Sequence, residues 1–125
     1  DLKVVNDQTG SPTYAPHLVK AIMGIARKIV AANGEGIEWG VYHAGGAGYA
    51  SWYEVAREIL DQSKAQGGPT TSLSAIGTDG YPTRAKRPAN SRLDCGKLAG
   101  TFGVTQPDWR EGVKLCVARL LKGET

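Results

Sequence analysis

The chain has 125 residues, of which 41% are hydrophobic and 22% charged, which predicts one folded domain rather than a disordered chain or two independent cores. Its net charge of +3 at pH 7 comes from scattered lysines and arginines that acids interrupt, which argues against a nucleic-acid partner. No run of about 18 apolar residues is present, so no membrane partner is expected, and two cysteines are too few for a disulfide framework.

The first part of the chain predicts a strand, a helix and a second strand. Residues 2–5 are a short β-branched run that ends in turn-forming residues, and they show no basic stretch followed by an apolar core, so a cytoplasmic protein is expected. Apolar residues recur at helical spacing over residues 16–32, and the proline suits the first turn of a helix. Residues 40–44 predict a strand, and the glycine-rich residues 45–48 a turn after it.

A capping box predicts where the next helix begins. Ser51 and Glu54 have the S-x-x-E spacing in which each side chain satisfies a free backbone N–H of the other residue. We expect this helix to end near Ala65, with Trp52 anchored in the core because it matches the apolar face.

The second half predicts one more strand, a long loop and two helices. Residues 72–76 form the strand, residues 77–91 the loop, Asp94 caps a short helix, and Trp109 lies on the buried face of the last helix. This order predicts a mixed α/β fold with too few strands for a complete doubly wound sheet.

The residues needed for several kinds of chemistry are missing from the expected positions. The glycines at 45–48 lack the G-x-G-x-x-G spacing, which favours a plain turn over a cofactor loop. No tyrosine has a lysine four residues on, so the Tyr-x-x-x-Lys pair of short-chain reductases is not found, and no catalytic residue is predicted. Neither histidine lies at metal-ligand spacing from a cysteine; we expect His43 to be buried and His17 to face solvent.

Five segments occur in the same order, at similar intervals, in one family of enzymes. They are VVNDQTGSPT (4–13), GVYH (40–43), SWYEVAREI (51–59), YPTRAKRPANSRLD (81–94) and PDWREG (107–112). Together they cover nearly the whole chain, which resembles the C-terminal portion of the dTDP-4-dehydrorhamnose reductase family, a group of extended short-chain dehydrogenase/reductases.

This resemblance implies reduction of the 4-keto group of dTDP-4-dehydro-L-rhamnose by NADPH or NADH, which gives dTDP-L-rhamnose for cell-surface polysaccharide. In such enzymes an N-terminal Rossmann domain carries the cofactor loop and the catalytic tyrosine and lysine. Residues 1–125 are therefore expected to form one sugar-nucleotide-binding domain with a late strand or two of the Rossmann sheet. The missing Rossmann domain is the expected partner, and this chain alone is expected to bind no cofactor and to be inactive.

The resemblance also points to residues that contact the dTDP-sugar. It assigns the diphosphate to Arg87 and, less directly, Arg84, because guanidinium suits bidentate contact with phosphate. The alternative is that Pro88 only stiffens a solvated loop and that Arg87 packs or pairs on the surface. Gln8 and Ser11 lie in a stretch that forms either a wall of the sugar pocket or a turn into the first helix.

Two further expectations concern metal and partners. Some family members bind Mg²⁺ through a carboxylate just after the Pro-Thr pair, but residues 14–17 here contain none, so no metal is expected. A non-catalytic regulatory or dimerisation module of the same fold is the alternative function. A homodimer is a candidate assembly, because helices that normally pack on a missing domain would leave an apolar face uncovered.

Overall fold

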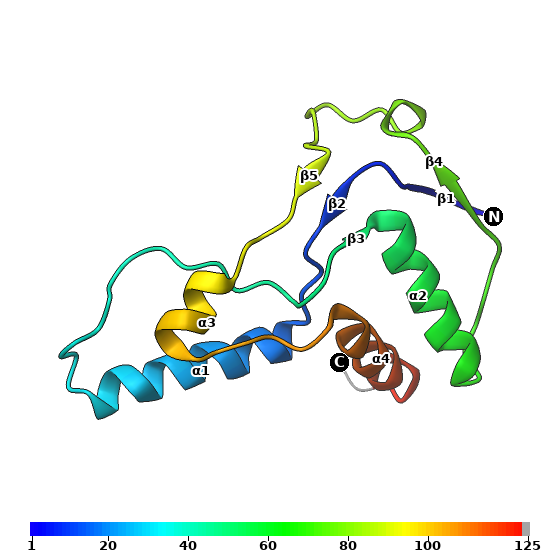
Figure 1. The fold of residues 1–125 in the computed structure, drawn as a ribbon. Helices are drawn as coiled ribbons and strands as arrows, with labels where there is room; N and C mark the ends of the chain where they lie inside the picture. Colours follow the sequence, from blue (N-terminus) through cyan, green and yellow to red (C-terminus); the bar gives the residue numbers. More distant parts are fainter. Residues whose placement is uncertain (124–125) are drawn as a thin grey trace.

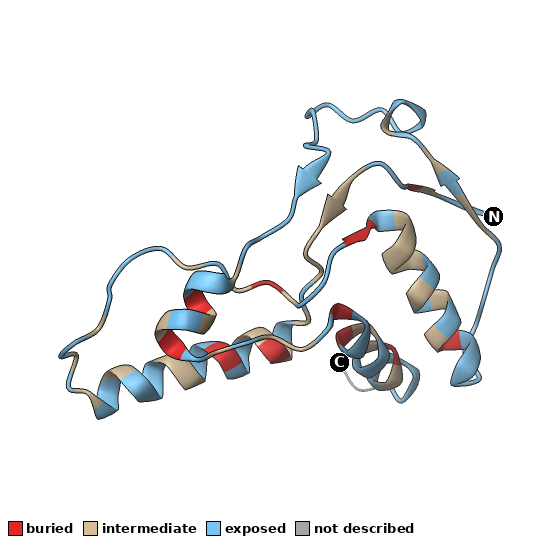
Figure 2. Ribbon diagram, in the orientation of Figure 1, coloured by how far each residue is buried: buried red, intermediate tan, exposed pale blue. Residues whose placement is uncertain are grey.

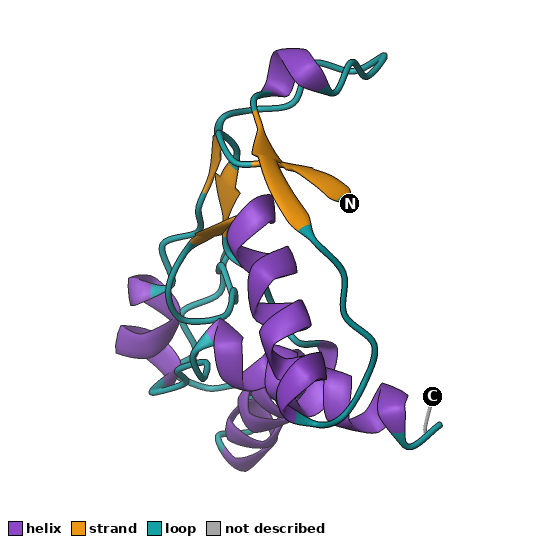
Figure 3. Cartoon of the chain, turned by 90° about the vertical axis from the view of Figure 1, so that its right-hand side faces the viewer, coloured by secondary structure: helices purple, strands orange, loops and turns teal. Residues whose placement is uncertain are grey.

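The computed structural model describes residues 1–123 and has a mixed α/β fold, as the sequence predicts. The strands gather toward one end of the molecule and most of the helical residues toward the other (Figures 1 and 3). The elements are β1 (Leu2–Val5), β2 (Thr9–Gly10), α1 (Ala15–Ala31), β3 (Ala50–Ser51), α2 (Trp52–Ala65), β4 (Leu73–Ile76), the 3₁₀ turn η1 (Thr78–Gly80), β5 (Asn90–Ser91), α3 (Gly96–Phe102) and α4 (Trp109–Leu121).

The first ten residues take part in two small sheets. β1 pairs in parallel with β4, in a register that sets Leu2 opposite Leu73. β2 lies between β3, which is antiparallel to it, and β5, which is parallel. The turn between β1 and β2, residues 6–8, therefore lies close to the start of α2 and to η1, which follow β3 and β4 directly.

Local capping signals place the starts of α2 and α4 as expected, whereas the residue that precedes α3 is Cys95, which makes no side-chain cap. The N–H of Ser51 donates to Glu54 Oε2 at 2.7 Å and the N–H of Glu54 donates to Ser51 Oγ at 3.1 Å, so the capping box is confirmed. Asp108 caps α4 by accepting the N–H of Arg110 at 2.9 Å. Asp94 accepts the N–H of Gly96, the first residue of α3, at 2.8 Å.

The predicted strand at residues 40–44 is wrong, because this stretch finds no strand to pair with. Tyr42 packs against α3 instead, edge-on to the ring of Phe102 at 5.2 Å between centroids and beneath the ammonium group of Lys97. His43, expected to be buried, is exposed as a result.

His17, expected to face solvent, is buried, so that prediction is wrong as well. Its ring meets the ring of Tyr14 edge-on at 5.0 Å between centroids. A Cβ built on Gly112 of α4 would lie 2.6 Å from Cβ of Tyr14, so the first turn of α1 packs closely on α4. The start of a helix is buried here because another helix covers it.

The core is small, and few residues are buried (Figure 2). The buried hydrophobic residues are Val5, Ala21, Ala50, Leu98, Phe102, Trp109 and Val117. On α1, Val19, Ile22, Met23 and Val30 are exposed. A homodimer that covers this face stays a prediction. Within residues 1–123, no helix is both long and apolar enough to cross a bilayer.

Candidate functional site

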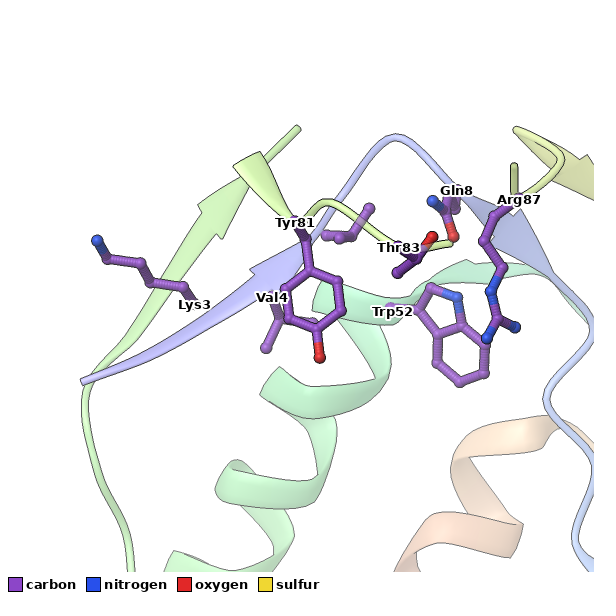
Figure 4. A pocket seen from close by; sticks show the side chains of 8 residues that line it. Lys3, Val4, Gln8, Trp52, Tyr81, Thr83 and Arg87 are labelled. Atoms are coloured by element: carbon purple, nitrogen blue, oxygen red, sulfur yellow. The ribbon is translucent and has the colours of Figure 1, made fainter. Parts of the chain in front are cut away.

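A cavity of about 450 Å³ opens between β1, the first turn of α2 and the loop after η1 (Figure 4). Its lining residues are Lys3, Val4, Val5, Gln8, Trp52, Tyr81, Thr83 and Arg87. The lining contains two cations and no carboxylate, so its electrostatic potential favours an anion. The volume lies in the range of sites for small organic ligands.

Arg87 is the cation with the clearest access to this cavity. Its side chain is exposed, and within residues 1–123 it makes no hydrogen bond or ion pair. Arg87 and Trp52 both line this cavity, and Figure 4 draws both side chains there. The donors of Arg87 are therefore free for a ligand. Within residues 1–123 Arg87 has no ionic partner, and its binding role stays a prediction beside the alternative of a solvated loop that Pro88 stiffens.

Gln8, which lines the cavity, and the neighbouring Asp7 form hydrogen bonds with Thr78 of η1. Gln8 Nε2 donates to Thr78 Oγ1 at 3.0 Å, and Asp7 accepts both the N–H of Thr78, at 2.9 Å, and its hydroxyl, at 2.7 Å. These two hydrogen bonds from Thr78 hold the pKa of Asp7 below its ordinary value. Since η1 leads directly into residues 81–87, the contacts with Thr78 help to position the loop that carries Arg87.

Replacing Asp7 with asparagine is expected to lower the melting temperature near neutral pH, because the charged acceptor of both Thr78 donors is lost. A carboxyl group whose pKa is lower in the folded state stabilises the fold above its unfolded pKa of about 3.9 and loses that effect as the pH falls through the folded pKa. The difference between the wild type and the variant should therefore shrink in acid. Thermal unfolding at neutral and acidic pH tests this, with Asp79→Asn as the control next to Thr78 in η1. An equal difference at both pH values would contradict it.

The structure does not bring Ser11 and Arg84 to the cavity. Ser11 Oγ accepts the N–H of Leu93 at 2.9 Å and so fixes the chain beyond β5. Arg84 is exposed and is not part of the lining. The structure thus places Gln8 and Arg87 in the lining of one cavity, and the binding roles of all four residues stay predictions.

Trp52 is the lining residue that the sequence misassigned. The prediction of a core anchor is confirmed for Trp109, which is 3% exposed, and wrong for Trp52, which is 60% exposed. Both tryptophans begin a helix directly after a capping residue, so local sequence does not distinguish them. Tyr81 and Thr83 were also missed as lining residues, although both lie in a segment shared with the family.

The glycine turn at residues 45–48 does not fit a dinucleotide. The N–H of Gly45 donates to Cys95 Sγ at 3.2 Å, that of Gly46 to Thr13 Oγ1 at 3.0 Å, and that of Ala47 to the carbonyl oxygen of Pro107 at 2.9 Å. These donors are engaged within the protein, whereas a pyrophosphate needs free backbone N–H groups. A smaller cavity of about 270 Å³ lies beside this turn.

The part of the chain that the structure describes holds two free thiols and no metal-binding cluster. Cys95 and Cys116 are both unpaired and half-buried. No group of three or more histidine, cysteine or acidic side chains in residues 1–123 is arranged to hold a metal ion. The candidate site is therefore the larger cavity with its aromatic and cationic lining.

Comparison with known proteins identifies relatives over nearly the whole chain. The model of the RmlD substrate binding domain matches residues 1–122. A dTDP-4-dehydrorhamnose reductase of Sinorhizobium fredii (strain NBRC 101917 / NGR234) is 39% identical over 125 residues, which cover 99% of this chain and 42% of that protein. The chain thus spans about two-fifths of the length of this curated relative.

Two crystal structures of dTDP-4-dehydrorhamnose reductases resemble the fold. That from Clostridium acetobutylicum has a TM-score of 0.75 at 30% identity and covers 97% of this chain and 39% of its own. That from Bacillus anthracis, in complex with NADP, has a TM-score of 0.70 at 26% identity and covers 91% of this chain and 36% of its own. The similarity in structure thus extends over a similar share of the reductases' length as the similarity in sequence.

Proposed function

Because the chain belongs to the RmlD substrate-binding-domain family, we propose that it binds a dTDP-linked sugar as the substrate-holding part of a dTDP-4-dehydrorhamnose reductase. In the proposed reaction, NADPH or NADH reduces dTDP-4-dehydro-L-rhamnose to dTDP-L-rhamnose in the cytoplasm, for polysaccharide biosynthesis. The Bacillus anthracis relative was crystallised with NADP. The glycine turn of this chain does not fit that cofactor, so the proposed place of the cofactor is the remaining part of such a reductase.

The observation that carries the proposal is the unpaired Arg87 in a cavity whose lining has no carboxylate. A nucleoside diphosphate sugar carries two negative phosphates, and a guanidinium group can donate two parallel hydrogen bonds to such a group. The aromatic and aliphatic lining residues supply apolar surface for the rest of the ligand. The arginine, the volume of the cavity and its apolar lining thus all suit a nucleoside diphosphate sugar.

The test is isothermal titration of the 125-residue chain with dTDP, for the wild type and three variants. Arg87→Ala is expected to weaken binding about 10- to 150-fold, since a hydrogen bond to a charged group contributes about 1.5–3 kcal/mol. The affinity of Arg87→Lys for dTDP should lie between those of the wild type and Arg87→Ala, because lysine keeps the charge but lacks the planar guanidinium group. Arg84→Ala is the matched control, because its side chain lies outside the lining, and should change the affinity less than about threefold.

Two results would contradict the proposal. One is a wild-type chain that does not bind dTDP at all. The other is an equal loss of affinity in Arg84→Ala and Arg87→Ala, which would indicate a diffuse effect of positive charge rather than a site in the cavity.

The alternative, a non-catalytic regulatory or dimerisation module of the same fold, is favoured by one observation. The exposed apolar residues of α1 lie three and four positions apart at Val19, Ile22 and Met23, which is the spacing of a helix face that packs on a neighbour. This face does not account for the cationic cavity, so we retain ligand binding as the principal proposal.

A further inference from the structure

The aromatic residues at the rim of the larger cavity are unusually exposed. Trp52 is 60% and Tyr81 59% exposed, and they come from the start of α2 and from the loop after η1. A tryptophan of this size gains free energy when it is buried, as Trp109 is at the equivalent position of α4. In the part of the chain that the structure describes, the ring of Trp52 is therefore accessible to a ligand, whereas that of Trp109 is not.

The backbone that carries Trp52 is nonetheless held firmly. The preceding Ser51 is buried, belongs to β3, and closes the capping box with Glu54. Its hydroxyl also donates to Asn6 Oδ1 at 2.6 Å, which joins α2 to the turn after β1. These hydrogen bonds fix the backbone position of Trp52 without requiring its ring to be buried.

The side chains around the indole ring complete a recognisable pattern. Figure 4 shows the indole of Trp52, the phenol ring of Tyr81 and the guanidinium of Arg87 projecting into the same space before the first turn of α2. Val4 and Val5 supply an apolar floor. Flat aromatic surface beside a cation suits a planar ring that is covalently joined to an anion.

We propose that Trp52, with Tyr81 as a second ring, binds the nucleobase of the sugar nucleotide by stacking, while Arg87 binds the diphosphate. This inference rests on the proposed function and assigns one end of the ligand to each side chain. Stacking is tolerant of base identity, because every base has a flat π-face. Trp52 should therefore contribute affinity to thymine and uracil nucleotides alike and nothing to inorganic pyrophosphate.

The test titrates the 125-residue chain with dTDP, UDP and pyrophosphate. Trp52→Ala is expected to weaken the binding of dTDP and of UDP about 5- to 150-fold. This corresponds to about 1–3 kcal/mol, the range for base stacking on aromatic side chains. Pyrophosphate affinity should stay unchanged in Trp52→Ala and fall in Arg87→Ala. Trp52→Phe should retain most of the affinity for dTDP and guards against a folding defect in the alanine variant.

Trp39 offers a matched control, since it is 68% exposed and lines neither cavity. Trp39→Phe should bind dTDP as the wild type does, and in this background dTDP should still quench the tryptophan fluorescence. The quenching should disappear when Trp52→Phe is added.

Three outcomes overturn the inference, and they are distinguishable. If Trp52→Ala binds dTDP like the wild type while Arg87→Ala does not, stacking on Trp52 is refuted and the proposed function stands. If the wild type binds neither dTDP nor pyrophosphate, the proposed function and this inference fail together. An equal loss of pyrophosphate and dTDP binding in Trp52→Ala would refute the division of the ligand between the two side chains.

Discussion

Replacing Gly46 with alanine is expected to destabilise the fold by about 3 kcal/mol, the upper part of the usual range for inserting an atom where no space exists. A Cβ at this position would lie 2.2 Å from the carbonyl oxygen of Pro12 and 3.6 Å from Cβ of Trp109. The nearest atom belongs to the backbone, so no flexible side chain can move aside. The turn at residues 45–48 would have to separate from the segment that leads from β2 into α1.

The control for this prediction is Gly100→Ala in α3. No atom lies within 4 Å of a Cβ at that position, so alanine should be neutral or stabilise the helix by about 0.5–1 kcal/mol. Urea unfolding of both variants measures the two free energies of unfolding. A Gly46→Ala variant that unfolds at the wild-type urea concentration would show that the turn can shift without cost.

The features that sequence predicted well are those that short stretches of chain determine. Helical periodicity placed α1, and the Ser51–Glu54 capping box placed the first residue of α2, because both depend on hydrogen bonds and spacing within a few residues. Strand β4 was also predicted, at residues 72–76. The mixed α/β class followed from the order of these elements.

The errors arose where a distant neighbour decides the outcome. The sequence of residues 40–44 is typical of a strand, but a β-strand forms only where it can form hydrogen bonds with a neighbouring strand. Here Tyr42 packs on α3 instead. The burial of His17 depends on Tyr14 and α4, which sequence spacing does not reveal. His17 is therefore buried and His43 exposed, which is the reverse of both predictions.

The candidate site was predictable in part. Arg87 and Gln8 were named from a family resemblance, and the structure brings both to one cavity. Trp52 was assigned to the core because apolar periodicity marks a helix face without saying which face meets the protein interior. The capping box fixes the position of Trp52 at the first residue of α2. The cavity beside Trp52 is formed by the loop that carries Tyr81, which is distant in sequence.

Leu98→Ala is the second change with a large expected effect, a loss of about 3 kcal/mol within the range of 2–5 kcal/mol for buried leucines. Leu98 is 1% exposed and is the most completely buried large side chain among residues 1–123. It lies on α3, which has only seven residues, and an isolated helix of that length is marginal in water. The helix therefore exists because Leu98 and Phe102 anchor one face of it in the core.

A small domain typically has a free energy of unfolding of about 5–15 kcal/mol, so this single substitution should remove a large share of it. Leu120→Ala on α4 is the matched control, because its side chain is exposed, and should cost less than about 1 kcal/mol. Urea unfolding compares the two variants, and amide hydrogen exchange should show protection lost first in α3. Because Lys28 of α1 donates to the carbonyl oxygen of Phe102, α1 should lose protection with it, and loss confined to α3 would contradict this account of the core.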